Sequence, residues 1–129
     1  MTHANAQSVR AAYEAFAAAD IDAVSNFIAE DCVWHITASG VLTGDYKGRD
    51  AVLGFLGRLM EETGGTFRVE THAVLGDDDH AVALNLTTGT RNGQTFTTKQ
   101  SAVYHMRDGQ TTEAWFFYDD AATIDKFFS

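Results

Sequence analysis

The sequence predicts an α+β domain whose helices lie on one face of an antiparallel sheet. In the first half of the chain, apolar residues recur with the 3.6-residue period of a helix. After Gly65 the period falls to two, as expected for strands. The pairs Asn92-Gly93 and Asp108-Gly109 then mark tight turns between neighbouring strands. Helical segments followed by a run of strands are typical of α+β architecture.

The chain begins with two predicted helices. Val9, Tyr13 and Phe16 have helical spacing in an alanine-rich segment, which predicts a helix over residues 4–19. Asp20 has a side chain suited to an N-cap and predicts a second, short helix directly after it.

A strand, a loop and a third helix are expected next. Residues 32–37 are rich in β-forming side chains and predict a short strand. The three glycines within residues 39–48 predict a loop. Residues 49–63 present a wide apolar face, which predicts a helix that ends at Gly64-Gly65.

Four strands and a last helix complete the predicted order. The strands are expected over residues 66–75, 80–90, 95–107 and 110–118. The short turns between them favour an antiparallel meander. Asp119 is expected either to cap a final helix over residues 120–128 or to act as a general acid or base.

The last long strand suggests a second layer of burial. Its end, Ala114-Trp115-Phe116-Phe117-Tyr118, does not alternate polar and apolar residues. An antiparallel strand that is covered on one face only should alternate. Helices cover one face, so we expect a second copy of the chain to cover the other. This predicts a homodimer packed through Trp115 and Phe117.

Composition and length exclude several classes of protein. The 129 residues fit a single domain over residues 1–129. The net charge of −9 argues against binding to nucleic acid or to an anionic membrane surface, and no apolar run is long enough to span a membrane. The single cysteine and the lack of a signal peptide favour a cytoplasmic location. Neither a metal site nor a cofactor is expected, because the five histidines show no ligand spacing.

Several short segments carry a resemblance to a known family. They are Tyr13-Glu14-Ala15-Phe16, Asp20-Ile21-Asp22, Val33-Trp34-His35, the stretch from Gly44 to Val52, Arg107-Asp108-Gly109-Gln110 and Glu113-Ala114-Trp115. In this order they resemble the SnoaL-like branch of the nuclear transport factor 2-like superfamily, over nearly the whole chain. The resemblance implies a cone-shaped fold, in which a curved antiparallel sheet wraps around the N-terminal helices and leaves a deep pocket. It also implies dimers through the outer face of the sheet.

In that orientation, strand alternation identifies the side chains that face the pocket. The strands are expected to contribute Trp34, Asn85, Thr87, Gln100, Tyr104, Phe116 and Tyr118, and the helices Tyr13, Phe16, Phe55 and Leu59. The aromatic residues fit core packing as well as ligand contact. Asn85 and Gln100 are more informative, because a polar side chain in the middle of a strand needs water, a ligand or a partner group.

The family's ketosteroid isomerases provide a test of the chemistry. Their base position falls on Ile36, their protonated acid on Ala102, and their tyrosine on Ala12 with Tyr13 one residue away. A shift of one residue would place His35 in the base position; otherwise His35 is an interface or core histidine. We therefore do not expect a proficient ketosteroid isomerase.

Two functions remain open from the sequence. The first is a cofactor-independent enzyme of isomerase or cyclase type that acts on a small, largely apolar carbonyl compound. Tyr104, Gln100 or Tyr118 would then donate hydrogen bonds to a developing oxyanion. The alternative is a non-catalytic module of the same fold for small-molecule binding or dimerisation, which the missing base favours.

Overall fold

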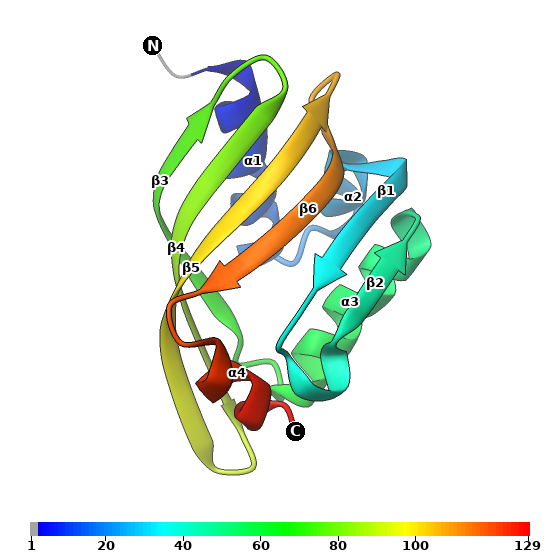
Figure 1. The fold of residues 1–129 in the computed structure, drawn as a ribbon. Coiled ribbons are helices and arrows are strands. Elements are labelled where there is room, and N and C mark those ends of the chain that lie inside the picture. Colours follow the sequence, from blue (N-terminus) through cyan, green and yellow to red (C-terminus); the bar gives the residue numbers. More distant parts are fainter. Residues whose placement is uncertain (1–2) are drawn as a thin grey trace.

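The computed structural model of the chain describes residues 3–129 (Figure 1). Its helices are α1 (Ala4–Ala17), α2 (Ile21–Phe27), α3 (Arg49–Glu62) and α4 (Ala121–Phe127), with a short 3₁₀ turn η1 (Gly40–Leu42). Its strands are β1 (Ile28–Ile36), β2 (Gly44–Lys47), β3 (Arg68–Gly76), β4 (His80–Arg91), β5 (Gln94–Arg107) and β6 (Gln110–Tyr118). No helix within residues 3–129 is long and apolar enough to cross a membrane.

The α+β class is confirmed, but the sheet is mixed rather than wholly antiparallel. Its six strands follow the order β2-β1-β6-β5-β4-β3, and β1 pairs with β6 in parallel. Local sequence gives no signal for this pairing, because the two strands meet from opposite ends of the chain. The expected loop of residues 39–48 contains η1 and the four-residue strand β2, which pairs with β1. Gly44, the first residue of that short strand, and Gly48, directly after its end, concealed it.

The sheet is curved, and helices α1, α2 and α3 lie on its concave side (Figure 1). Irregular register contributes to the bend, since β-bulges increase local twist. Register shifts occur between Thr71 and Ala73 in β3 and between His105 and Met106 in β5. The hydrophobic core fills the space between the concave face and the helices.

Asp119 does not cap the last helix. Asp120 occupies the N-cap position, where its side chain accepts a hydrogen bond from the Thr123 amide at 3.1 Å. Asp119 instead accepts hydrogen bonds from the Thr98 hydroxyl and, at 3.2 Å, from the Lys99 amide. The hydrogen bond from Thr98 lowers the pKa of Asp119 below its usual value. The helix begins one residue later than predicted because two adjacent aspartates both suit a cap.

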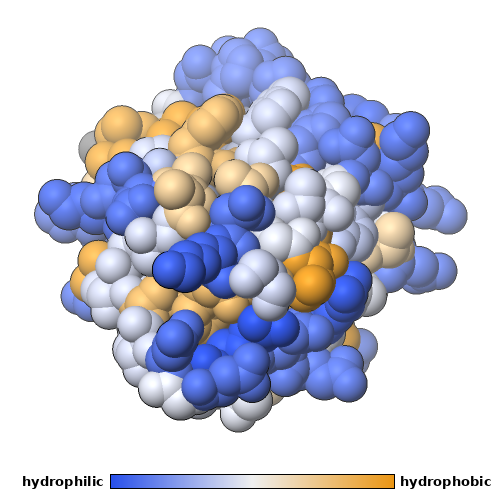
Figure 2. Space-filling view, turned by 60° about the horizontal axis from the view of Figure 1, so that its bottom comes forward, coloured by the Kyte–Doolittle hydropathy of each residue, from blue (hydrophilic) through white to orange (hydrophobic). Residues whose placement is uncertain are grey.

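The C-terminal segment closes one end of the helical layer. The Val41 amide donates to the Phe128 carbonyl at 2.9 Å, and the Gly40 amide donates to Asp125 Oδ1 at 2.8 Å. Arg91 Nη1 donates to the Phe127 carbonyl at 2.9 Å. Figure 2, which brings the end of the molecule near α4 forward, shows mostly hydrophilic residues with separate hydrophobic patches.

On the outer face of the sheet, His35 joins three strands. Its Nδ1 lies 2.8 Å from Asp45 Oδ1 on β2, and its Nε2 lies 2.6 Å from Glu113 Oε2 on β6. A neutral imidazole has only one N–H, so two carboxylate partners favour the doubly protonated ring. Glu113 and then Asp45 raise the pKa of His35 above its ordinary value. The ring stacks on Trp115 with centroids 5.2 Å apart, and His105 Nδ1 lies 3.7 Å from Glu113 Oε1.

We expect Gly40→Ala to weaken the closure at α4. Gly40 has φ +54°, and an added Cβ would overlap the backbone carbonyl group of Phe128. The free energy of unfolding, measured in urea, should fall by about 2 kcal/mol or more. Gly57→Ala is the control, because Gly57 lies within α3 with no heavy atom near its Cβ position. That substitution should raise stability by up to about 1 kcal/mol. Equal effects of both substitutions would contradict the assignment of Gly40.

We expect His35 to make stability depend on pH. A histidine whose pKa is raised on folding contributes stability below its unfolded pKa of about 6.5, and loses that contribution as pH rises through the folded pKa. The stability difference between the native protein and His35→Gln should therefore be larger at pH 6 than at pH 9. Urea unfolding at both pH values measures it. His72→Gln, at an exposed position on β3, is the control and should leave the pH dependence of stability unchanged. If the stability difference between the native protein and His35→Gln were the same at both pH values, the prediction would be wrong.

Candidate functional site

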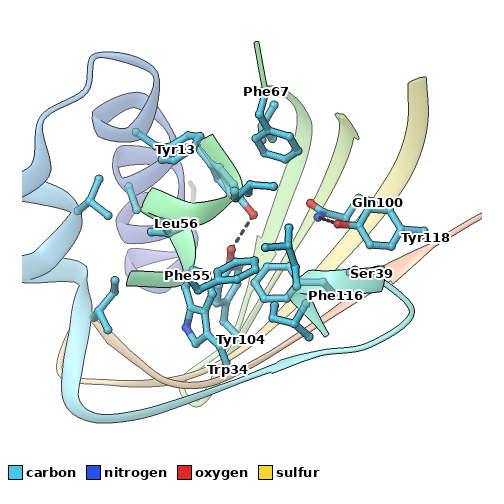
Figure 3. A pocket seen from close by; sticks show the side chains of 18 of the residues that line it. Tyr13, Trp34, Ser39, Phe55, Leu56, Phe67, Gln100, Tyr104, Phe116 and Tyr118 are labelled. Atoms are coloured by element: carbon cyan, nitrogen blue, oxygen red, sulfur yellow. Dashed lines mark hydrogen bonds between the residues drawn. The ribbon is translucent and has the colours of Figure 1, made fainter. Parts of the chain in front are cut away.

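A cavity of about 90 Å³ lies between the concave face of the sheet and the helices (Figure 3). The strands contribute eight residues to its lining: Ile28, Trp34, Ile36, Val69, Gln100, Tyr104, Phe116 and Tyr118. The helices contribute Ala12, Tyr13, Phe16, Val24, Phe27, Phe55, Leu56 and Leu59. Phe67, Thr37, Ser39, Leu42 and Phe128 complete the wall. This volume holds several water-sized molecules, and the wall is mainly apolar, as in many small-molecule sites.

Aromatic rings pack against one another along the wall. Trp34 lies at the centre, with its ring centroid 5.0 Å from that of Phe116 and 6.2 Å from that of Phe55. Tyr104 meets Phe116 edge-on at 6.0 Å. Such contacts between large rings stabilise a fixed arrangement. The cavity is therefore bordered by side chains that support each other.

A chain of hydrogen bonds crosses the polar part of the site. The hydroxyl oxygens of Tyr13 and Tyr104 lie 2.6 Å apart, and they point toward one another in Figure 3. Asn85 Nδ2 donates to the Tyr13 oxygen at 3.1 Å and to Gln100 Oε1 at 2.9 Å. Gln100 Nε2 donates to the Tyr118 oxygen at 3.2 Å. Side chains from α1, β4, β5 and β6 thus form one connected network.

The two hydroxyl groups of Tyr13 and Tyr104 have one more proton than the hydrogen bond between them uses. Each phenol carries one O–H proton. Only one of the two protons lies between Tyr13 and Tyr104, whichever hydroxyl donates. The other proton has no partner among the hydrogen bonds of the described residues. The pair can therefore donate one hydrogen bond to a molecule in the cavity.

Burial keeps these phenols neutral. It raises the pKa of Tyr13 to about 12 and the pKa of Tyr104 well above its ordinary value. Burial also raises the pKa of Tyr118. At neutral pH all three side chains are hydrogen-bond donors rather than bases.

The structure places most of the expected pocket residues around the cavity, and Asn85 and Thr87 outside its lining. Asn85 lies behind Tyr13 and Gln100, to which it donates. Thr87 is fully buried and donates to the Thr98 carbonyl at 3.3 Å. Both belong to β4, none of whose residues lines the cavity.

The remaining candidates lie away from the cavity. His35 faces outward on β1, so the one-residue shift that would make it a base is wrong. Asp119 is exposed and also lies outside the lining. Among residues 3–129, no side chain that lines the cavity carries a carboxylate or an imidazole. The described part of the chain also holds no cluster of three or more His, Cys, Asp or Glu suited to a metal ion.

Some lining residues were not predicted. Leu56 lies on the apolar face predicted for residues 49–63, and Val24 and Phe27 have the spacing of one face of α2, so their pattern could have indicated them. Ser39 and Phe128 had no such signal. They reach the cavity because η1 and the C-terminal segment pack together.

Comparisons with known proteins agree with this geometry. Residues 9–114 match the SnoaL-like domain family. An uncharacterised protein of Mycobacterium tuberculosis is 25% identical over 122 residues, which cover 94% of this chain and 93% of that protein. Bal32a, from a soil-derived mobile gene cassette, is 29% identical with a TM-score of 0.93, covering 98% of this chain and 97% of its own.

A second similar structure comes from a protein described as a putative polyketide cyclase. It is from Xanthomonas campestris, is 25% identical with a TM-score of 0.74, and the match covers 96% of each chain. The family match spans most of the chain and agrees with the curved sheet packed on N-terminal helices. The chain belongs to the SnoaL-like domain family.

Proposed function

We propose that the cavity binds a small, largely apolar molecule that carries a carbonyl group. The observation that carries this proposal is the spare O–H proton of the Tyr13–Tyr104 pair inside an apolar cavity. A carbonyl oxygen is an acceptor that suits this donor, while the rest of the molecule meets aromatic walls. The similar structure described as a putative polyketide cyclase supports a ligand of this class.

The same donors suit an isomerase- or cyclase-type reaction. A hydrogen bond that strengthens as negative charge develops on the carbonyl oxygen lowers the barrier to enolate formation. Proton transfer between carbons also needs a base, and Ile36 occupies the position where a ketosteroid isomerase has one. We therefore infer that this protein is not a proficient ketosteroid isomerase. Non-catalytic binding is the second candidate, favoured by the lack of a base among the described lining residues.

Binding should depend on the tyrosine pair. Cyclohexanone is a suitable probe, with affinity measured by NMR titration. Replacing both hydroxyls with Tyr13→Phe and Tyr104→Phe should weaken binding about five- to tenfold, as expected for one lost hydrogen bond. Tyr46→Phe is the matched control, because its hydroxyl donates to the Leu42 carbonyl and lies outside the lining. Unchanged affinity in the double variant would contradict the proposed role of the pair.

We further propose a homodimer through the outer face of the sheet. This face exposes Leu75, Leu84, Leu86 and Phe117, with 63% and 57% of Leu75 and Phe117 accessible. Val82, Val103 and Trp115 form a continuous cross-strand row beside them. Stable interfaces bury about 800 Å² per partner, which an apolar sheet face of this extent can supply. A second copy presents the same apolar surface, so the contact can be symmetric.

If this face forms the dimer, a charge placed on it should shift the protein toward monomer. Light scattering at micromolar concentration should give twice the monomer mass for the native protein. Phe117→Glu places a charge in the apolar face and should shift the population toward monomer. Ala11→Glu adds a charge at an exposed position of α1, on the opposite side of the sheet, and should leave the dimer intact. A native protein that is monomeric at this concentration would exclude the proposal.

A further inference from the structure

We propose that Phe128 is a specificity-determining residue that sets the length of the molecule the cavity accepts. A ligand whose carbonyl oxygen is held at Tyr13 and Tyr104 extends along the sheet until it meets Phe128. The length limit rests on the proposed binding function, whereas the position of Phe128 as an end wall of the cavity does not.

Phe128 bounds the cavity at the end remote from the tyrosine pair. It lines the cavity, and its ring packs on Phe96 of β5 with centroids 6.1 Å apart. Phe96 and Tyr104 are buried on the same face of β5 and lie eight residues apart, which is about 26 Å along a strand. Gln100 lies halfway between them and also lines the cavity. The lining therefore extends along β5 from Tyr104 toward Phe128.

The backbone around Phe128 is held by hydrogen bonds that do not involve its ring. The Phe128 carbonyl accepts from the Val41 amide at 2.9 Å. The preceding carbonyl, of Phe127, accepts from Arg91 Nη1 at 2.9 Å, and Arg91 Nε donates to Glu62 at 3.0 Å. A shorter side chain at position 128 therefore removes the wall and leaves the segment in place.

The ring of Phe128 is closely enclosed. The residue is 3% exposed, and its ring meets that of Phe127 edge-on at 4.8 Å, in addition to the contact with Phe96. Packed rings of this kind leave little room for displacement, because protein interiors are as dense as organic crystals. A ligand that is too long is therefore excluded, since it cannot push the ring aside without strain.

A series of 4-alkylcyclohexanones with increasingly long alkyl chains measures the length limit. For the native protein, affinity from NMR titration should rise about fourfold with each added carbon, as more apolar surface is buried, and should fall once the chain meets Phe128. In Phe128→Ala the fall should occur at a chain longer by roughly two carbons, because the space of the ring becomes available. Phe128→Leu should move the limit in the same direction, and it serves if the alanine variant does not fold.

Phe127→Ala is the matched control. Phe127 is also a buried aromatic residue and packs on Phe96 at 4.6 Å, but it does not line the cavity. This variant should keep the native length limit. A limit that is unchanged in Phe128→Ala and Phe128→Leu, or that moves as far in Phe127→Ala, would overturn the role of Phe128 and leave the binding function standing.

The end wall can also be tested without a carbonyl ligand, because xenon enters apolar cavities. Leu42 lines the cavity next to the backbone contact between Val41 and Phe128. Under xenon pressure, the methyl signals of Leu42 should shift more in Phe128→Ala than in the native protein or in Phe127→Ala. Equal shifts in all three proteins would show that Phe128 does not close the cavity. If the native protein binds none of the ketones, the binding function and the length limit fail together, and the xenon shifts still decide the position of Phe128.

Discussion

The hydrogen bond between Tyr13 and Tyr104 joins the helical layer to the centre of the sheet inside an apolar space. A hydroxyl buried there needs a partner, because desolvation without one is unfavourable. The 2.6 Å contact provides that partner for both phenols but leaves one proton over. Asn85 extends the contact to Gln100 and Tyr118, so that groups on four elements share one network. The structure depends on this network to keep polar groups in a cavity with aromatic walls.

The curved sheet separates two kinds of surface. Alternation along β5 and β6 directs Gln100, Tyr104 and Tyr118 to the concave face, while Trp115 and Phe117 face outward. On the concave face, polar groups are bonded to each other beside the cavity. The outer face exposes apolar side chains beside the contact of His35 with Asp45 and Glu113. The same strands therefore line the cavity on one side and present an apolar surface on the other.

Much of this arrangement could be predicted from local patterns. The change of hydrophobic period after Gly65 and the two Asx-Gly turns are strong signals, and they gave the helices, the long strands and their antiparallel pairing correctly. The parallel contact of β1 with β6 could not be predicted in this way, because it joins distant segments through backbone groups that every residue has. Strand β2 is only four residues long, begins at Gly44 and is followed by Gly48, so loop signals outweighed it.

In the site, too, residues placed by local strand alternation could be predicted, and residues placed by packing between distant segments could not. Alternation places Trp34 and Gln100 inward because each lies at a fixed position within a regular strand. His35 depends on register, since a shift of one residue moves a side chain to the opposite face. Phe128 reaches the cavity only through the packing of the C-terminal segment on η1. Asn85 was expected at the pocket but lies outside its lining, because its side chain is bonded to Tyr13 and Gln100, which do line it.

The proposed function requires that the tyrosine pair donates a hydrogen bond to a carbonyl group in the cavity. The carbon-13 chemical shift of carbonyl-labelled cyclohexanone, observed in the bound state, measures this directly, because a hydrogen bond to the oxygen moves the carbonyl signal downfield. We expect the bound signal to lie downfield of its position in an apolar solvent, and to return to that position when Tyr13 and Tyr104 are both replaced by phenylalanine. A bound signal at the apolar-solvent position in the native protein would show that the tyrosine pair donates no hydrogen bond to the ligand.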